Sequence, residues 1–148
     1  MLRVQILCTG KLKEKFYAEA CEEYKKRLQR YCSLEIIELT ETGDIVRDGK
    51  AMLEKIPAGT RVIALCIEGK SLSSEELSER ISGCALNGCS RLAFLIGGSD
   101  GLSPEVKARA DERLSMSRMT FPHHLARVMV LEQIYRAFNI AEGGKYHK

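Results

Sequence analysis

The segment Leu92-Ala-Phe-Leu-Ile-Gly-Gly-Ser-Asp-Gly-Leu-Ser-Pro-Glu105 decides the fold of this chain. Its apolar run, 92–96, is typical of a buried strand in a parallel sheet. Gly97 and Gly98 end the run, and Ser103 is placed to cap a helix that begins at Pro104. Ligands of open α/β sheets bind outside the carboxyl ends of the strands, where glycines let them approach the backbone. The segment therefore predicts the ligand-binding edge of the molecule.

Strand and helix patterns alternate along the rest of the chain. We expect strands at 3–8, 34–39, 61–67 and 92–96, with a short strand or extended loop at 114–119. We expect helices at 14–31, 45–56, 73–87 and 123–141, and one that begins at Ser103. The segment Ser73-Ser-Glu-Glu76 has the spacing of a capping box. The alternation predicts one α/β domain over residues 1–148, with a mostly parallel sheet and helices on both faces.

Two of the expected helices carry apolar faces. The helix at 14–31 has Phe16, Ala20, Tyr24 and Leu28 at intervals of four, which predicts one buried stripe. The helix at 123–141 is apolar on more than half of its circumference, through Leu125, Val128, Met129, Leu131, Ile134, Tyr135, Phe138 and Ile140. A helix that is apolar on most sides is buried on most sides. In a small domain the second partner is expected to be another subunit, so we predict a homodimer that buries this helix.

Composition and charge limit the classes of partner. Apolar residues make up 45% of the chain and charged residues 29%, as in ordinary globular proteins. No apolar run approaches the roughly 18 residues of a membrane helix, and the N-terminus enters a strand pattern without the layout of a signal peptide. We therefore expect a cytoplasmic location and no membrane partner. The net charge of +3 permits a nucleic-acid partner, whose phosphates would have to meet a local cluster or two copies of the chain.

The cysteines and histidines do not predict a metal site. The six cysteines are Cys8, Cys21, Cys32, Cys66, Cys84 and Cys89. No pair has the C-x-x-C spacing of zinc or redox sites, so we expect six reduced thiols and no disulfide framework. His123 and His124 are adjacent, and on a helix they point about 100° apart rather than forming a two-histidine clamp.

Three strand ends are candidates for one pocket. They are Leu65-Cys-Ile-Glu-Gly-Lys70, Ile96-Gly-Gly-Ser-Asp-Gly101 and Leu114-Ser-Met-Ser-Arg-Met-Thr-Phe-Pro122. The glycines match neither a Walker loop, which needs a lysine, nor a dinucleotide fingerprint, which follows the first strand. Taken together, the three loops supply backbone amides and apolar side chains at one sheet edge. Such a pocket suits an adenine and a ribose.

Three longer motifs carry a family resemblance. They are LIGGSDGLSP at 95–104, LSMSRMTFPHHLARVMVLEQIYRAFNI at 114–140 and KYHK at 145–148. With them the chain resembles, over its whole length, the RlmH family of bacterial 23S ribosomal-RNA methyltransferases of the SPOUT superfamily. The resemblance implies a C-terminal part threaded into a trefoil knot, which physical rules alone would not predict. It also implies S-adenosylmethionine as cofactor, bound by Leu65, Gly97 and the segment Met116, Ser117, Arg118, Met119, Thr120 and Phe121.

The resemblance further implies a substrate and an assembly. The family methylates N3 of a pseudouridine (the 1915-type position) in helix 69 of 23S rRNA, on assembled ribosomes and as a homodimer. By analogy, we expect the C-terminal tail of one subunit to face the cofactor of the other. Candidate RNA-binding residues are Arg118, Arg127, Lys145 and Lys148, and candidate catalytic residues are Arg136, Tyr146 and His147. His147 is the only one of these with an ordinary pKa suited to proton transfer near neutrality.

Simpler roles compete for several of these residues. Arg136 has the spacing for an ion pair with Glu132, and a Tyr-His-Lys tail is often a frayed end. Asp100 and Glu105 are the acids nearest the glycines, and we expect a turn role and a helix-terminus role for them rather than contact with the cofactor's positive end. Two other functions stay open from the residues alone. One is a non-catalytic RNA-binding module, and the other is a small nucleotide or flavin binder that a thermal-shift panel would separate.

Overall fold

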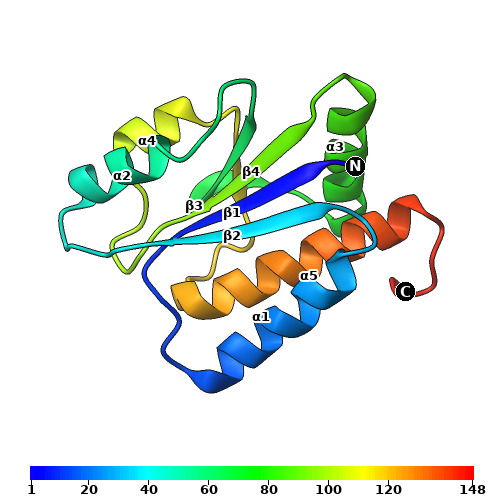
Figure 1. Cartoon of the computed structure of the whole chain (residues 1–148), viewed down its shortest axis with the longest axis horizontal. Coiled ribbons are helices and arrows are strands. Elements are labelled where there is room, and N and C mark those ends of the chain that lie inside the picture. Colours follow the sequence, from blue (N-terminus) through cyan, green and yellow to red (C-terminus); the bar gives the residue numbers. More distant parts are fainter.

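A computed structural model describes residues 1–148 as five strands and five helices (Figure 1). The strands are β1 (Arg3–Thr9), β2 (Ser33–Leu39), β3 (Arg61–Ser71), β4 (Arg91–Ile96) and β5 (Glu112–Ser115). The helices are α1 (Lys15–Leu28), α2 (Ile45–Leu53), α3 (Ser74–Leu86), α4 (Pro104–Arg109) and α5 (His123–Ala141). The sheet has the order β2-β1-β4-β3-β5, and every neighbouring pair is parallel. The carboxyl ends of β1, β3 and β4 therefore lie at one edge.

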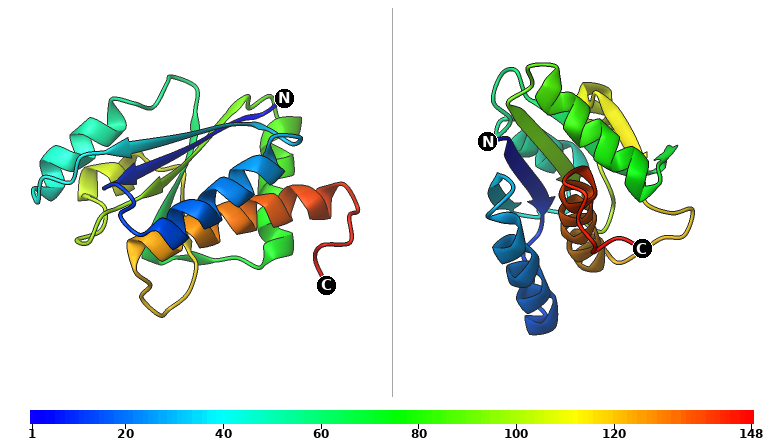
Figure 2. Two further views of the ribbon diagram at one scale, coloured as in Figure 1. Left: turned by 60° about the horizontal axis from the view of Figure 1, so that its bottom comes forward. Right: turned by 90° about the vertical axis from the view of Figure 1, so that its right-hand side faces the viewer.

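Helices cover both faces of this sheet, which confirms the predicted α/β class (Figure 2). One face packs on α1, α3 and α5 through a core that contains Val4, Ile6 and Phe94. The other face packs on α2 and α4 through a core that contains Leu7, Leu95 and Met52. Neighbouring residues of β1 thus enter different cores, because successive side chains of a strand point to opposite faces. The trefoil knot stays a prediction.

The helix starts follow from the caps that the sequence predicts. Ser73 accepts a hydrogen bond from the Glu76 N–H while the Glu76 side chain accepts one from the Ser73 N–H, so the capping box is present. Ser103 accepts from the Val106 N–H, and Pro104 occupies the first turn of α4. Each cap satisfies backbone donors that a helix leaves free at its N-terminus.

Two local predictions are resolved or corrected by the structure. Residues 114–119, expected as a short strand or an extended loop, contain both: β5 ends at Ser115, and residues 116–122 form the loop that leads into α5. On α1, Phe16 is 64% exposed, so the expected stripe is wrong at its first residue. Leu28 of that stripe is buried, and so is Cys21, which lies outside the stripe. The side of α1 that faces the core is set by its packing against α5, and a four-residue interval in the sequence does not reveal it.

The cysteine prediction is also corrected. Cys84 and Cys89 form a disulfide in this structure, with their Cα atoms 5.0 Å apart. The chain turns between them through Asn87 and Gly88, after the end of α3, and this turn brings the sulfurs together without a C-x-x-C spacing. The other four cysteines are free, and Cys8, Cys21 and Cys32 are buried.

Helix α5 lies between α1 and α3 on its face of the sheet (Figure 2). All of its residues except Ala141 are buried or half-buried. Part of its wide apolar surface is therefore covered within the same chain, so the predicted homodimer does not follow from the helix pattern alone. No helix of the protein has the length and apolar content needed to span a membrane.

Candidate functional site

A cleft of about 750 Å³ lies at the carboxyl ends of β3 and β4, beneath the loop that follows β5. Its walls come from the three strand ends that the sequence singles out. Seven of the eight predicted cofactor contacts line it: Leu65, Gly97, Met116, Ser117, Met119, Thr120 and Phe121. Arg118 does not line the cleft, and its side chain is exposed. The cleft has the size of small-molecule sites in proteins.

An irregularity in β3 shapes one wall of this cleft. Leu114 of β5 pairs first with Leu65 and again with Lys70, so the residues between these two bulge out of the ladder. Cys66, Ile67 and Glu68, which belong to this bulge, line the cleft. A bulge re-aims side chains where regular pairing would keep them in the sheet.

The glycine turn after β4 is packed against its own chain. A Cβ on Gly97 would lie 2.4 Å from the Gly101 carbonyl carbon, and one on Gly98 would lie 2.3 Å from a Glu41 carboxylate oxygen. Gly97 is thus required for the turn to close, whereas a side chain on Gly98 would displace the Glu41 carboxylate; the sequence suggested only room for a ligand. Gly101, with φ of 79°, adopts a conformation that side chains disfavour.

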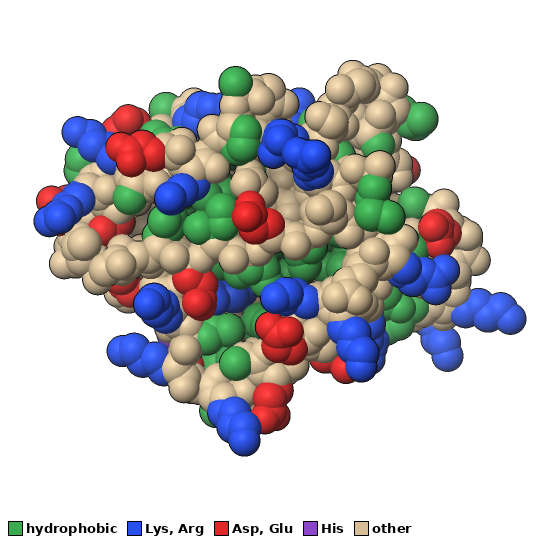
Figure 3. Space-filling view, in the orientation of Figure 1, with side chains coloured by type: hydrophobic (Ala, Val, Ile, Leu, Met, Phe, Trp, Pro, Cys, Tyr) green, Lys and Arg blue, Asp and Glu red, His purple; other side chains and the backbone are tan.

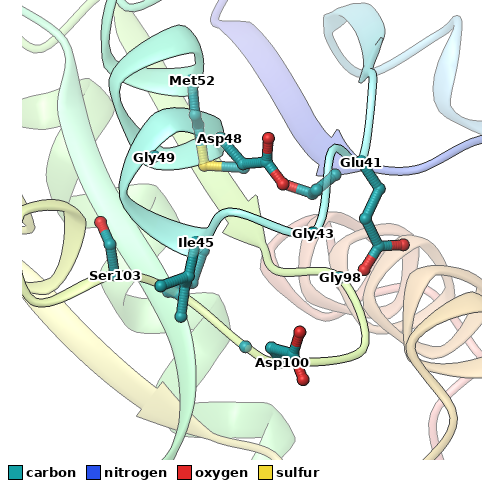
Figure 4. A pocket seen from close by; sticks show the side chains of 12 residues that line it. Glu41, Gly43, Ile45, Asp48, Gly49, Met52, Gly98, Asp100 and Ser103 are labelled. Carbon is teal, nitrogen blue, oxygen red and sulfur yellow. The ribbon is translucent and has the colours of Figure 1, made fainter.

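Glu41, in the loop that follows β2, holds this turn through hydrogen bonds. Its carboxylate accepts hydrogen bonds from the Ser99 hydroxyl at 2.8 Å and from the Ser99 N–H at 2.9 Å. Figure 4 shows Glu41 beside the Gly98 backbone, in a small hollow that Asp48 and Ser103 also line. The hydrogen bonds from the Ser99 side chain and backbone lower the pKa of Glu41. No motif in the sequence points to Glu41, because it is 58 residues from its partner.

The acids near the cleft differ in position. Asp100 and Glu68 line it, whereas Glu105 does not. Glu68 accepts a hydrogen bond from Lys107 at 2.6 Å, which lowers the pKa of its carboxyl group. Asp100 has no ion-pair partner and stands in the cleft wall, so its carboxylate can meet a positively charged ligand group.

The loop that follows β5 is turned by its own serines. The Ser115 hydroxyl donates to the Ser117 carbonyl at 3.0 Å, and the Ser117 hydroxyl accepts from the Met119 N–H at 3.0 Å. Met119 is 74% exposed although it lines the cleft. The loop therefore offers backbone groups and an apolar side chain to whatever the cleft holds.

The three predicted catalytic residues come together on the surface of α5. Arg136 donates to Glu132 at 2.6 Å and lies 3.0 Å from Nδ1 of His147. The Tyr146 hydroxyl donates to Glu132 at 2.6 Å, and Nε2 of His147 contacts Glu75 at the start of α3. The tail is therefore docked rather than frayed, and the predicted Glu132–Arg136 ion pair is part of its docking site. Glu75 was not among the candidates.

These contacts affect the ionisation of Tyr146 and Glu132 and determine the tautomer of His147. Burial raises the pKa of the Tyr146 hydroxyl, and its hydrogen bond to Glu132 raises it further. Burial opposes ionisation of Glu132, but the hydrogen bonds from Arg136 and Tyr146 outweigh it and lower the pKa of that carboxyl group. Because arginine can only donate, Nδ1 of His147 accepts from Arg136, and Nε2 carries the proton that points to Glu75. Both ring nitrogens of His147 are thus engaged.

The predicted RNA contacts separate into two groups. The side chain of Arg127 is only 2% exposed; it donates to Glu38 and, at 3.0 Å, to the Gly10 carbonyl. Its prediction as an RNA-binding residue is wrong, because the first turns of α5 pack against the segment after β1. Arg118, Lys145 and Lys148 are exposed and form no ion pair. Figure 3 shows Lys and Arg intermixed with Asp and Glu on one face, without a continuous basic surface.

Several solved structures share the fold of this chain. A probable methylase family protein from Haemophilus influenzae matches with a TM-score of 0.61, over 98% of this chain and 70% of that one, at 11% identity. A SpoU methyltransferase from Streptomyces viridochromogenes, solved with AdoMet, matches with a TM-score of 0.50 over 95% of this chain and 58% of that one, at 12% identity. At these identities the likeness establishes the fold alone, which is that of SpoU-type methyltransferases.

The family follows from the sequence. Residues 2–147 match the family described as predicted SPOUT methyltransferase, and the chain belongs to it. Proteins named ribosomal RNA large subunit methyltransferase H from Clostridioides difficile strain 630 and Clostridium botulinum strain Langeland are each 50% identical over 159 aligned positions, which cover 99% of this chain and all of theirs. The resemblance drawn from the three motifs is confirmed, and the chain is a homologue of these RNA methyltransferases.

Proposed function

We propose that this protein transfers a methyl group from S-adenosylmethionine to N3 of a pseudouridine in helix 69 of 23S rRNA, on assembled ribosomes in the cytoplasm. The observation that carries the proposal is the convergence of seven predicted cofactor residues on one cleft, in a chain that is half identical to proteins named as large-subunit rRNA methyltransferases. The positions of Gly97 and Leu65 at neighbouring strand ends support the cofactor assignment.

The residues of the cleft fit the cofactor. Leu65, Met116 and Phe121 offer apolar surface for an adenine, and the loops offer backbone groups for a ribose. Asp100 would face the positively charged methionyl end, whereas the sequence alone favours a turn role for it. When bound, S-adenosylmethionine supplies an electrophilic methyl group, and the chain's task is to position the accepting nitrogen against it.

The N3 proton of the base has to leave, and our candidate acceptor is His147 from the tail of a second subunit, because each tail is held at the middle of its own α5. Its Nδ1 is engaged by Arg136, so this hydrogen bond must give way before the ring can take a proton. Tyr146 is a poor base because its raised pKa keeps the hydroxyl protonated. If His147→Gln retained full single-turnover methylation on saturating ribosomes, His147 would not be the base.

We further propose that the protein is a homodimer built through α5. Half-buried apolar side chains along α5, among them Leu125, Val128 and Met129, support this assembly. Two subunits also bring together the exposed cations Arg118, Lys145 and Lys148, which matters because one chain carries a net charge of only +3. Sedimentation equilibrium at micromolar concentration tests it, and a monomer there would refute it.

The decisive experiment combines purified protein, labelled S-adenosylmethionine and ribosomes that lack helix 69 methylation. One methyl group per ribosome, mapped by mass spectrometry to N3 of the helix 69 pseudouridine, is the expected result. No transfer despite stabilisation by the cofactor would reject this target and retain the methyltransferase. Neither transfer nor stabilisation would reject the enzyme and favour the RNA-binding module.

A further inference from the structure

The segment 10–17, which joins β1 to the start of α1, borders the cofactor cleft. A Cβ on Gly10 would lie 3.7 Å from Nε2 of His123, and His123 lines the cleft. Nδ1 of His124 lies 3.1 Å from the Glu14 carboxylate, so the start of α5 is joined to the start of α1. Figure 2 shows these two helix starts side by side. A molecule that enters the cleft from this side therefore meets the segment 10–17.

A buried ion pair anchors this segment. Arg127 donates to Glu38 and, at 3.0 Å, to the Gly10 carbonyl. Glu38 also accepts a hydrogen bond from the Leu12 N–H at 3.0 Å, and the Leu12 side chain packs against the core. The backbone of the segment is thus fixed by the fold, and a partner that binds there has little of it to order.

Two cations of the segment are free to meet a ligand. Lys11 and Lys13 are exposed and form no ion pair. Glu14, Glu38 and Glu41 border the segment, and each already has a hydrogen-bond partner within the chain. A phosphate can therefore approach the two ammonium groups without first breaking an ion pair.

An exposed aromatic ring follows these lysines. Phe16, the second residue of α1, is 64% exposed, and its ring centroid lies 4.4 Å from that of Tyr17. The contact restrains the ring although most of the side chain faces solvent. Unpaired RNA bases stack on aromatic side chains while lysines hold the neighbouring phosphates. Contact with the same segment of a second copy would bring like charges together, so RNA is the better partner.

We propose that residues 10–17 form an RNA-binding surface beside the cofactor cleft, in which Lys11 and Lys13 contact phosphates and Phe16 stacks on an unpaired base of the substrate. The inference rests on the proposed function and adds to it the part of the enzyme that holds the RNA strand near the target nucleotide. In this arrangement Arg127 is a positioning residue, because it holds the segment from inside the protein and does not itself reach the RNA.

The salt dependence of ribosome binding tests the two lysines. The double variant Lys11→Gln/Lys13→Gln is compared with the wild type by filter binding to ribosomes that lack helix 69 methylation, at several salt concentrations. We expect the log–log slope to fall by about two units. The matched control is Lys50→Gln/Lys55→Gln, which removes two exposed, unpaired lysines at α2, on the other face of the sheet. Its slope should stay as in the wild type, and an equal change in both variants would overturn the assignment.

Affinity at constant salt tests the ring. Phe16→Ala should weaken ribosome binding at least about fivefold and leave the salt slope unchanged, since stacking involves no phosphate. Leu86→Ala is the control, because Leu86 is 86% exposed and ends α3, near the amino end of β4 and away from the cleft. Equal affinities of Phe16→Ala and the wild type would overturn the stacking role. Dissociation of a wild-type dimer by Phe16→Ala in sedimentation would also overturn it, because the ring would then be a subunit contact.

These binding measurements separate the surface from the proposed function, because they need neither cofactor nor methyl transfer. Weakened binding in both variants, on ribosomes that the wild type binds but does not methylate, would retain the surface and reject the target. Unchanged binding in both variants, with helix 69 fully methylated by the wild type, would reject the surface and retain the proposed function.

Discussion

The Tyr146 hydroxyl donates a 2.6 Å hydrogen bond to Glu132, fourteen positions earlier in the chain, and this contact folds the C-terminal tail back along α5. Arg136 pairs with the same carboxylate. Glu132 lies nine positions after His123, which corresponds to ~14 Å of helix from the end of α5 at the cleft. The tail is thus held at the middle of α5 and not at its far end.

Docking of the tail should depend on pH. The pKa of Glu132 is lowered in the folded protein, so its contribution is fully present above the ordinary carboxyl value and is lost as the pH falls through the lowered one. We expect hydrogen exchange at the Tyr146 N–H, which donates to Asn139, to stay slow from neutral pH down to about 5 after correction for the intrinsic rate. As the pH falls further, through the lowered pKa of Glu132, protection should be lost.

Tyr146→Phe is the control for this prediction. It removes the hydroxyl that Glu132 accepts and keeps the ring, which packs 4.8 Å from Tyr135 between ring centroids. Hydrogen exchange at residue 146 should then be faster at neutral pH than in the wild type, and its protection should change less as the pH is lowered. If the wild-type tail exchanged rapidly at pH 7, the docked arrangement would be refuted.

Gly97→Ala should disrupt cofactor binding. The added Cβ would meet the Gly101 backbone at 2.4 Å, so the turn between β4 and α4 must open. We expect at least a tenfold loss of affinity for S-adenosylmethionine, measured by calorimetry. Gly83→Ala is the matched control: it lies within α3, nothing stands within 4 Å of its added Cβ, and it should raise stability by up to about 1 kcal/mol. Equal affinities in the two variants would contradict the packing of the turn.

Substitution of Arg127 should change the stability of the protein, and substitution of Arg118 should change its binding to RNA. Arg127→Met leaves Glu38 without its buried partner, and since that carboxylate keeps 34% of its side chain exposed, we expect a loss of about 2 kcal/mol in the free energy of unfolding. Arg118→Gln should leave stability unchanged and reduce the salt dependence of ribosome binding by about one unit in the log–log slope. Denaturant unfolding and binding at several salt concentrations measure the two effects. A stable Arg127→Met variant with weakened RNA binding would restore the role predicted from the sequence.

The cysteines should fall into three classes of reactivity. Burial raises the pKa of Cys8 to about 12 and that of Cys32 to about 11, so neither should react with iodoacetamide in the native protein. Cys66 is half-buried and should be labelled first among the free thiols, although burial raises its pKa too. Cys84 and Cys89 should be labelled only after reduction. Peptide mapping by mass spectrometry checks this order, and labelling of Cys84 without reductant would show that the pair is reduced in solution.

Local chemistry made much of this protein predictable. The segment 92–105 specifies a buried strand, a glycine turn and a capped helix, and the structure has all three, because each depends on residues close together in the chain. The bounds of α5 and the capping box of α3 were predictable for the same reason. The three motifs at 95–104, 114–140 and 145–148 were also sufficient to identify the family.

Contacts between distant residues were decided only by the tertiary structure. Glu41 meets Ser99 across 58 positions, Arg127 meets Glu38 across 89, and His147 meets Glu75 across 72. A sequence pattern reports which side of a helix or strand is apolar but not which segment packs there, so Arg127 looked like an RNA contact and Phe16 like a core residue. The sequence did not reveal the contact between Cys84 and Cys89 either, although they are only five positions apart, because it depends on how the chain turns after α3. The sequence by itself thus determined the elements, the glycine turn and the family, while packing decided which charges are buried, how the tail docks and that the segment 10–17 borders the cleft.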